Sequence, residues 1–142
     1  MKVEEPLAGA PIRIQGRAQV VLRAGMNPIR VKRVYEKPEE SDGVRILVDR
    51  LWPRGLSKKE AAVDLWLKEL APSNELRLRF HHDRDRWPEF RREYLEELRG
   101  KADLLGQARS RRAGGPVTLL YAARDTERNN AVVLREALDT DH

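Results

Sequence analysis

The sequence predicts an α/β fold: a single three-layer domain with a small, mostly parallel sheet of about four strands and flanking helices. Two apolar runs, residues 44–48 and 116–121, have the β-branched and aliphatic composition of covered strands. Each run ends abruptly in a polar loop, and segments of helical periodicity lie between the two runs. With 142 residues, the chain has the usual length of one domain.

Residues 1–25 are predicted to be a flexible N-terminal extension, with the α/β domain spanning residues 26–142. The extension contains Gly, Ala, Pro and scattered charge without sustained periodicity, and its only apolar stretch is Val20-Val21-Leu22. Met26 is a candidate for the true start of the protein.

The first strand is predicted at residues 29–35, because apolar and charged side chains alternate there. The acidic connection 36–43 contains Pro38 and is too short for a full crossover helix. The sequence therefore leaves open whether this strand and the strand at 44–48 run parallel or antiparallel.

Helices and one further strand are predicted between the two apolar runs. Ser57 and Glu60 have the spacing of a capping box, so a short helix should begin at Lys58. Alternating polarity indicates a strand at 63–68, and Ser73 can cap a helix at 74–81.

Longer helices are predicted in the second half of the chain, at residues 86–99 and 102–112. Trp87, Phe90, Tyr94 and Leu98 recur at helical intervals in the first of them and should form one buried face. After the strand at 116–121 comes a helix whose available N-caps are Asp125 and Thr126 and whose apolar stripe is Ala131, Leu134, Ala137 and Leu138.

The composition excludes several classes of function. The chain has no cysteine, which rules out disulfides, thiolate metal sites and a cysteine nucleophile. No apolar run approaches the roughly 20 residues of a membrane span, and no secretory signal is recognisable. We therefore expect a cytoplasmic protein without a membrane partner, while its cofactors and oligomeric state stay open.

The formal net charge of +5 invites a nucleic-acid-binding interpretation. Much of the charge, however, alternates with glutamate on predicted helices, as in the i,i+4 pair of Arg92 and Glu96. A solvated helix face is the favoured explanation. Nucleic acid stays a less favoured partner.

Polar residues follow both apolar runs, at the strand ends where ligands bind in open α/β sheets. Arg50, Arg54 and Arg77 are candidates for recognising an anion, since a guanidinium offers paired donors to phosphate or carboxylate. The alternative is that they pair with Asp49, Glu69 or Asp125. Trp52 can either stack on a ligand ring or cover the edge of the sheet.

The candidate catalytic residues are Asp49, Tyr121, Asp125 and His82. His82 with Asp83 or Asp125 can act as a general acid–base pair, although a histidine at a helix carboxyl end also stabilises the helix dipole. Adjacent histidines on a helix project roughly 100° apart, and the sequence has no second cluster of ligands, so no metal site is expected.

Several motifs occur in a specific order, namely residues 49–57, Leu70-Ala71-Pro72-Ser73, Phe80-His81-His82-Asp83 and the strand 117–121 followed by Ala122, Ala123, Asp125 and Asn129. In this order the chain resembles the YeaO-like branch of the domain-of-unknown-function 488 family, over about Ile29 to Leu138. The resemblance implies a small bacterial or archaeal cytosolic α/β protein whose site lies in the two loops, and it brings no assigned activity.

The chain departs from its family pattern after the last strand. Other branches place Cys and His there, and YeaO-like relatives often have His near Arg128 and Asn130, whereas this chain has neither residue in that loop. The resemblance therefore carries no histidine- or thiol-dependent chemistry to this loop.

We expect the two loops to form one pocket for a small phosphorylated or carboxylated ligand, with Ser73, Arg77 and Asn129 among its binding residues. Arg50 or Arg54 should pair with Asp125 while the pocket is empty. The alternatives are a nucleic-acid-binding module and a non-catalytic interaction protein.

Overall fold

The structure is a computed structural model that describes residues 27–140 apart from the side chain of His82, and it confirms the predicted α/β class. Its sheet has four strands, β1 (Ile29–Arg33), β2 (Val44–Leu47), β3 (Leu65–Trp66) and β4 (Val117–Tyr121). The strand order is β1-β4-β2-β3, and every neighbouring pair is parallel. The expected N-terminal extension and Met26 lie outside the described residues.

The first two strands do not pair with each other, because β4 lies between them and is parallel to both. Leu119 of β4 stands opposite Val31 on one side and Ile46 on the other. The connection from β1 to β2 contains only a 3-10 helix, Glu40–Asp42. It ends at Gly43, where φ is 66° and an added Cβ would lie 2.0 Å from the Pro116 carbonyl oxygen, so only glycine fits without displacing β4.

Within residues 27–140, five α-helices and three further 3-10 helices accompany the sheet. The α-helices are α1 (Lys58–Ala61), α2 (Asn74–His82), α3 (Trp87–Arg99), α4 (Ala102–Ser110) and α5 (Asn130–Asp139), and the 3-10 helices are Lys68–Leu70, Arg84–Arg86 and Arg111–Ala113. Both predicted helix starts are confirmed, with the Ser57–Glu60 capping box before α1 and the Ser73 cap before α2.

Several boundaries differ from the sequence-based expectation. The strands expected at 29–35 and 44–48 end at Arg33 and Leu47. The strand expected at 63–68 is reduced to Leu65–Trp66, and the helix expected at 102–112 ends at Ser110 and continues as a 3-10 turn. Helix α5 is capped by Asn129, whose side-chain oxygen accepts from the Val132 N–H at 3.0 Å. Asp125 and Thr126 are therefore not its caps, because the loop continues four residues beyond Asp125 before the helix starts.

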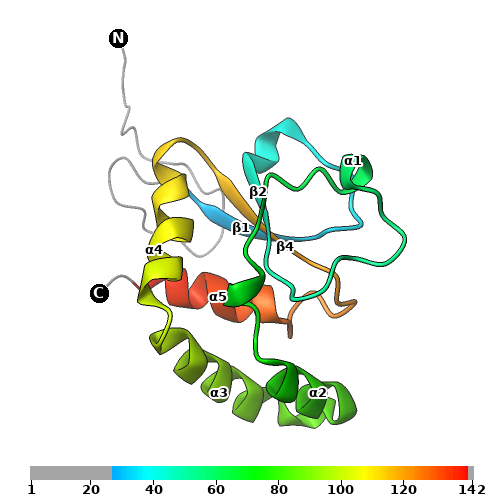
Figure 1. The fold of residues 1–142 in the computed structure, drawn as a ribbon, viewed down its shortest axis with the longest axis vertical. Coiled ribbons are helices and arrows are strands. Elements are labelled where there is room, and N and C mark those ends of the chain that lie inside the picture. The colour runs from blue at the N-terminus through cyan, green and yellow to red at the C-terminus, as the bar shows by residue number, and fades with distance from the viewer. Residues whose placement is uncertain (1–26, 141–142) are drawn as a thin grey trace, which may run out of the picture.

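The main hydrophobic core lies on one face of the sheet, where α2 to α5 gather (Figure 1). Helix α5 contacts β1 and β4 directly, α3 packs on α5, and α2 packs on α3. The predicted buried face of α3 is confirmed for Phe90, Tyr94 and Leu98, and Trp87 packs against it partly buried. The Phe90 ring also stacks on Phe80 of α2 with centroids 4.6 Å apart.

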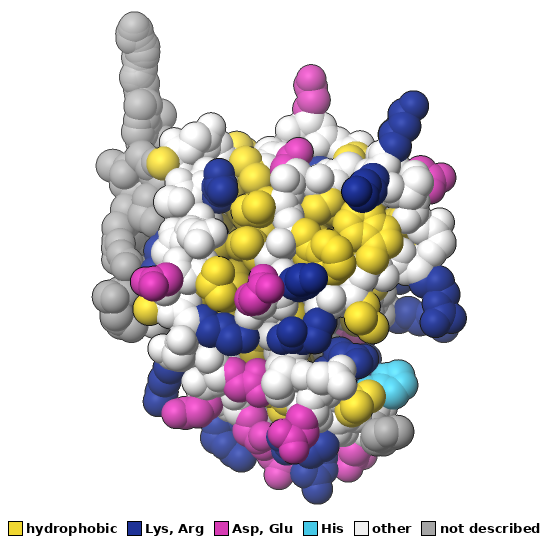
Figure 2. Space-filling view, viewed as in Figure 1, with side chains coloured by type: hydrophobic (Ala, Val, Ile, Leu, Met, Phe, Trp, Pro, Cys, Tyr) yellow, Lys and Arg dark blue, Asp and Glu magenta, His cyan; other side chains and the backbone are white. Residues whose placement is uncertain are grey.

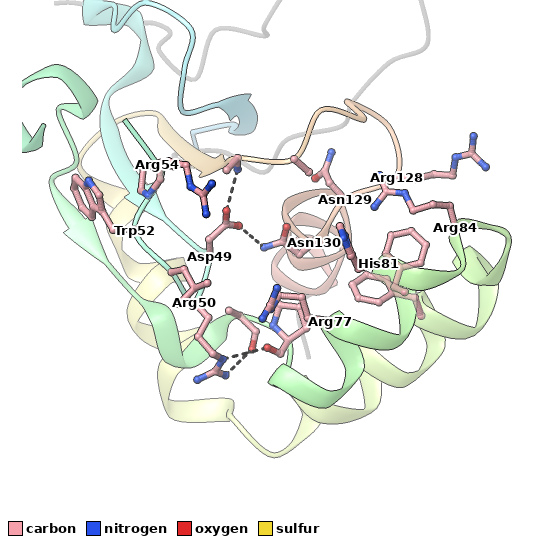
Figure 3. Close-up of a pocket in the computed structure, with 18 of the residues that line it drawn as sticks. Asp49, Arg50, Trp52, Arg54, Arg77, His81, Arg84, Arg128, Asn129 and Asn130 are labelled. Atoms are coloured by element: carbon pink, nitrogen blue, oxygen red, sulfur yellow. Dashed lines mark hydrogen bonds between the residues drawn. The ribbon is translucent and has the colours of Figure 1, made fainter. Parts of the chain in front are cut away.

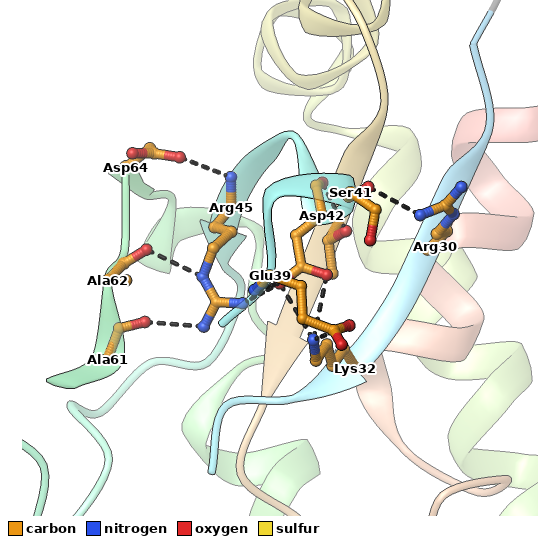
Figure 4. A network of polar contacts seen from close by, with 10 residues as sticks. Arg30, Lys32, Glu39, Ser41, Asp42, Arg45, Ala61, Ala62 and Asp64 are labelled. Carbon is orange, nitrogen blue, oxygen red and sulfur yellow. Dashed lines mark hydrogen bonds and ion pairs between the residues drawn. The ribbon is translucent and has the colours of Figure 1, made fainter. Parts of the chain in front are cut away.

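The opposite face of the sheet is covered by α1 and the loops around it, so the outer layers are unequal. A small apolar cluster of Val34, Leu47, Ala61 and Leu120 lies there. Beside it, the buried Arg45 donates to the Asp42 carboxylate and to the carbonyl oxygens of Ala61 and Ala62 (Figure 4). This polar network fixes α1 and the β1–β2 connection to β2.

Within residues 27–140, no helix combines the length and the apolar composition that crossing a bilayer demands.

Candidate functional site

A pocket of about 370 Å³ lies at the carboxyl ends of the strands (Figure 3). Its walls come from the loop after β2, from α2 and the turn that follows it, and from the loop that leads from β4 into α5. The two loops singled out in the sequence therefore share one rim, because β2 and β4 are neighbours in the sheet. The polar lining residues are Tyr35, Asp49, Arg50, Trp52, Arg54, Arg77, His81, Arg84, Arg128, Asn129 and Asn130.

Asp49 lines the pocket and ties three elements together. Its carboxylate accepts from the Ala122 N–H at 2.9 Å and from the Asn130 side-chain amide at 3.0 Å, and its carbonyl accepts from the Trp66 indole at 2.8 Å. Desolvation by burial raises the pKa of Asp49, although these hydrogen bonds and the charge of Arg77 oppose the shift. The carboxylate thus holds the end of β2 against the exit of β4 and the start of α5.

The predicted arginines all line the pocket, and their hydrogen bonds are few or long. Arg50 reaches the carbonyl oxygens of Ala71 and Pro72 only at 3.3 and 3.4 Å. The Arg54 side chain makes no hydrogen bond or ion pair to any residue of 27–140. Arg77 donates to Asn74 at 2.6 Å, yet its Nε atom is buried without a partner among the described residues. These guanidiniums retain unused donors.

The sequence interpretation missed two further arginines in the pocket wall. Arg84, in the turn after α2, lies over the Phe80 ring with 4.8 Å between its Cζ atom and the ring centroid. Arg128 forms an ion pair with Asp125 at 3.4 Å. Both residues belong to charged turns that look solvated in the sequence. Their position in the pocket wall depends on how α2 packs beside the loop between β4 and α5, which the sequence does not show.

Three candidate site residues do not line the pocket. Ser73 caps α2 and donates to Glu97 at 2.6 Å, so its hydroxyl is committed to helix packing. Tyr121 is buried in the main core, and that burial raises its pKa. Asp125 accepts from the backbone N–H groups of Arg128 and Glu127, which lower its pKa.

The ion pair expected between Arg50 or Arg54 and Asp125 is absent. The Asp125 carboxylate is engaged by its own loop and by Arg128, while Arg50 turns toward the carbonyl oxygens before α2. Asp125 pairs with groups of its own loop because these contacts cost less conformational entropy than ordering a long arginine side chain across the pocket.

Trp52 and Asn129 line the pocket and also hold structure. The Trp52 indole donates to the Leu56 carbonyl at 2.8 Å and meets Trp66 edge-on with centroids 5.5 Å apart. Both rings pack against the small apolar cluster on the α1 face of the sheet. Asn129 caps α5 and donates to the Asp125 carbonyl. The side chain of His82 lies outside the described part of the chain, and its catalytic role stays a prediction.

The part of the chain that the structure describes contains no cluster of three or more His, Asp or Glu residues with the geometry of a metal site. The pocket can instead offer guanidinium and amide donors around one half-buried carboxylate, a set that suits binding of an anion.

Comparison with known proteins places the chain in a family. A family model described as the inactive DUF488-N3 subclade matches residues 28–142. The uncharacterised protein YeaO of Escherichia coli (strain K12) is 47% identical over 117 residues, which cover 78% of this chain and 96% of that protein. The uncharacterised proteins Rv3073c of Mycobacterium tuberculosis (strain H37Rv) and Mb3100c of Mycobacterium bovis are each 42% identical over 111 residues, 78% of this chain and 93% of theirs. No solved structure matches significantly.

Proposed function

The chain belongs to the DUF488 family, in the subclade described as inactive, and we propose that its pocket binds a small anionic ligand without converting it. The observation that carries this proposal is the charge of the lining. Of the described residues, five arginines and one carboxylate, Asp49, line a pocket of about 370 Å³. That volume is at the lower end of the usual range for small-molecule sites, about 300–1,000 Å³.

The unused donors support the same proposal. A buried donor without a hydrogen bond costs about 1–3 kcal/mol, which is the situation of the Arg77 Nε atom. A phosphate or carboxylate in the pocket would supply acceptors for it and for the Arg54 guanidinium. Hydrogen bonds between charged partners are roughly twice as strong as neutral ones.

The candidate catalytic groups give less support to turnover. Asp49 already holds two hydrogen bonds that join β2 to β4 and α5, Tyr121 is in the core, and Asp125 faces its own loop. Each of these three groups is either buried in the core or already engaged in hydrogen bonds that hold the fold together.

The alternatives have weaker support. Several arginines of the outer helices are matched by glutamates, in the pairs Arg79–Glu93, Arg91–Glu136 and Arg99–Glu96. Five arginines gather at the pocket, and such a compact cluster favours a small anion over a nucleic-acid backbone, which a longer basic stripe would follow. The exposed Leu51 at the rim is the main apolar feature in favour of a protein partner. The cytoplasmic location stays a prediction.

Thermal-shift measurements and calorimetry with inorganic phosphate, pyrophosphate and simple phosphorylated sugars test the proposal. We expect at least one of these anions to raise the melting temperature of the wild type and to have a smaller effect on Arg54→Gln. Arg99→Gln is the matched control, because Arg99 is 76% exposed and lies outside the pocket. An absent response to all anions, or an equal loss in both variants, would contradict the proposal.

A further inference from the structure

The positive charge of the pocket exceeds what one anionic group balances. Five guanidiniums face the single carboxylate of Asp49, a surplus of four charges. Asp125, which pairs with Arg128 beside the pocket, reduces the surplus to three. A phosphate monoester carries about −1.5 to −2 at pH 7, so one phosphate would leave at least one guanidinium of the pocket without a counter-charge.

Two of the three surplus guanidiniums lie at two ends of the pocket. Figure 3 shows Arg54 on the side of the β2 loop and Arg84 on the side of α2, with Asp49 and Asn130 between them. The third, Arg50, is directed to the carbonyl oxygens of Ala71 and Pro72, and the charge of Arg77 acts on Asp49. Figure 2 shows basic side chains gathered between the apolar surface of the loops and the mixed-charge surface of the helices.

The two ends differ in how their arginines are held. Arg54 makes no side-chain hydrogen bond or ion pair to residues 27–140, whereas Arg84 lies over the Phe80 ring, which also contacts the rings of Trp87 and Phe90. Each guanidinium keeps its donors for a partner. Two separate cationic ends on either side of the Asp49 carboxylate favour a ligand with an anion at each end.

Resting on the proposed function, we propose that the ligand is a compact molecule with two anionic groups, such as a bisphosphate or a phosphorylated carboxylic acid, held at Arg54 and Arg84. The pocket volume limits the ligand to the size of a small metabolite. The unengaged lone pairs of the Asp49 carboxylate can accept a hydroxyl of the segment between the two anions.

Titration calorimetry with two matched pairs of probes tests this inference. Glycerol 3-phosphate is compared with 3-phosphoglycerate, which has a carboxylate in place of a hydroxymethyl group, and fructose 6-phosphate with fructose 1,6-bisphosphate, which adds a phosphate. We expect the second anion to tighten binding at least tenfold in one pair, and the pair that responds shows which anion fits. Equal affinities within both pairs would overturn the inference while binding itself would still support the proposed function. Absence of binding by all four would contradict both.

Variants separate specific contacts from general attraction of charge. Arg54→Gln and Arg84→Gln should each reduce the affinity for the two-anion probe to that of its one-anion partner. The one-anion probe should lose affinity in only one of the two variants, since it occupies one end. Arg99→Gln should change neither probe. If both pocket variants weaken the one-anion probe equally, the arginines converge on a single anion and the inference is wrong.

Discussion

Asp49 is a half-buried carboxylate whose two oxygens accept hydrogen bonds from Ala122 and Asn130. Burial raises its pKa, so between its unfolded and folded pKa values the native state keeps a proton that the unfolded chain has lost. The contribution of Asp49 to stability therefore falls as pH rises through this window. Above the window, the full cost of desolvating the ionised carboxylate lowers the stability.

The variant Asp49→Asn removes this titration. We expect the stability of the wild type relative to the variant to decrease between pH 4 and pH 7, as measured by urea denaturation. Asp103→Asn, at an exposed position on α4, corrects for the general effect of removing one carboxylate. A difference that stays constant or grows with pH would show that the hydrogen bonds outweigh the desolvation.

The sequence identifies a site residue when the chemistry of the residue and the end of a strand coincide. Arg50 and Arg54 are found in this way because they follow a recognisable buried strand. Arg84 is missed because its place depends on tertiary packing. Ser73, expected to bind ligand, and Asp125, a catalytic candidate, lie outside the pocket lining, and their side chains hydrogen-bond to neighbours that the sequence alone does not rank.

At the scale of elements, the buried ion pair of Asp42 and Arg45 holds together β2, α1 and the segment between β1 and β2. Asp42→Ala should cost about 3–5 kcal/mol at pH 7, because it leaves the buried guanidinium without a counter-charge. Denaturant titration measures this cost. Combining it with Arg45→Met should cost less than the sum of the single changes.

The exposed end of the same network provides a control. Glu39 also pairs with Lys32, but its side chain is 63% exposed, so Glu39→Ala should cost no more than about 1 kcal/mol. Equal costs for Asp42→Ala and Glu39→Ala would mean that burial of the pair has little energetic effect.

Helix α2 allows a matched comparison of burial. Leu76 is 2% exposed and packs in the main core, whereas Leu78, two residues later, is 41% exposed. Leu76→Ala should cost about 2–5 kcal/mol and Leu78→Ala about 0.5 kcal/mol or less, since only the first leaves a cavity. Denaturation midpoints measure both. Similar midpoints for the two variants would reject the packing of α2 against α3.

Periodicity and capping predict the elements well, as at α2 and α3, because both signals are local. The strand order is not local. Nothing in residues 29–48 indicates that β4, about 70 residues later, inserts between β1 and β2. The shortening of β3 also depends on a contact between distant residues. The Arg45 backbone N–H donates to the Asp64 side chain, and β2 and β3 pair only at Ile46–Leu65 and Leu47–Trp66.

At the scale of the whole molecule, the family match begins beside a contact that fixes the chain before β1. The match starts at residue 28, and Asn27 exchanges hydrogen bonds with Arg112, donating to its carbonyl at 2.7 Å and accepting from its guanidinium at 2.9 Å. Strand β1 then pairs with β4 along its full length. We therefore predict that a chain that keeps Asn27 and β1 folds without residues 1–25.

Deleting residues 1–25, so that the chain starts at Met26, should leave the melting temperature within a few degrees of the full-length value. A change of about 1 kcal/mol shifts the melting temperature of a domain of this size by roughly 2–8 °C, so calorimetry resolves even a weak contribution. A second truncation that starts at Val34 should abolish cooperative unfolding, because it removes β1 and leaves the edge of β4 unpaired. Loss of folding in the first truncation would show that Val20-Val21-Leu22 is an integral part of the domain.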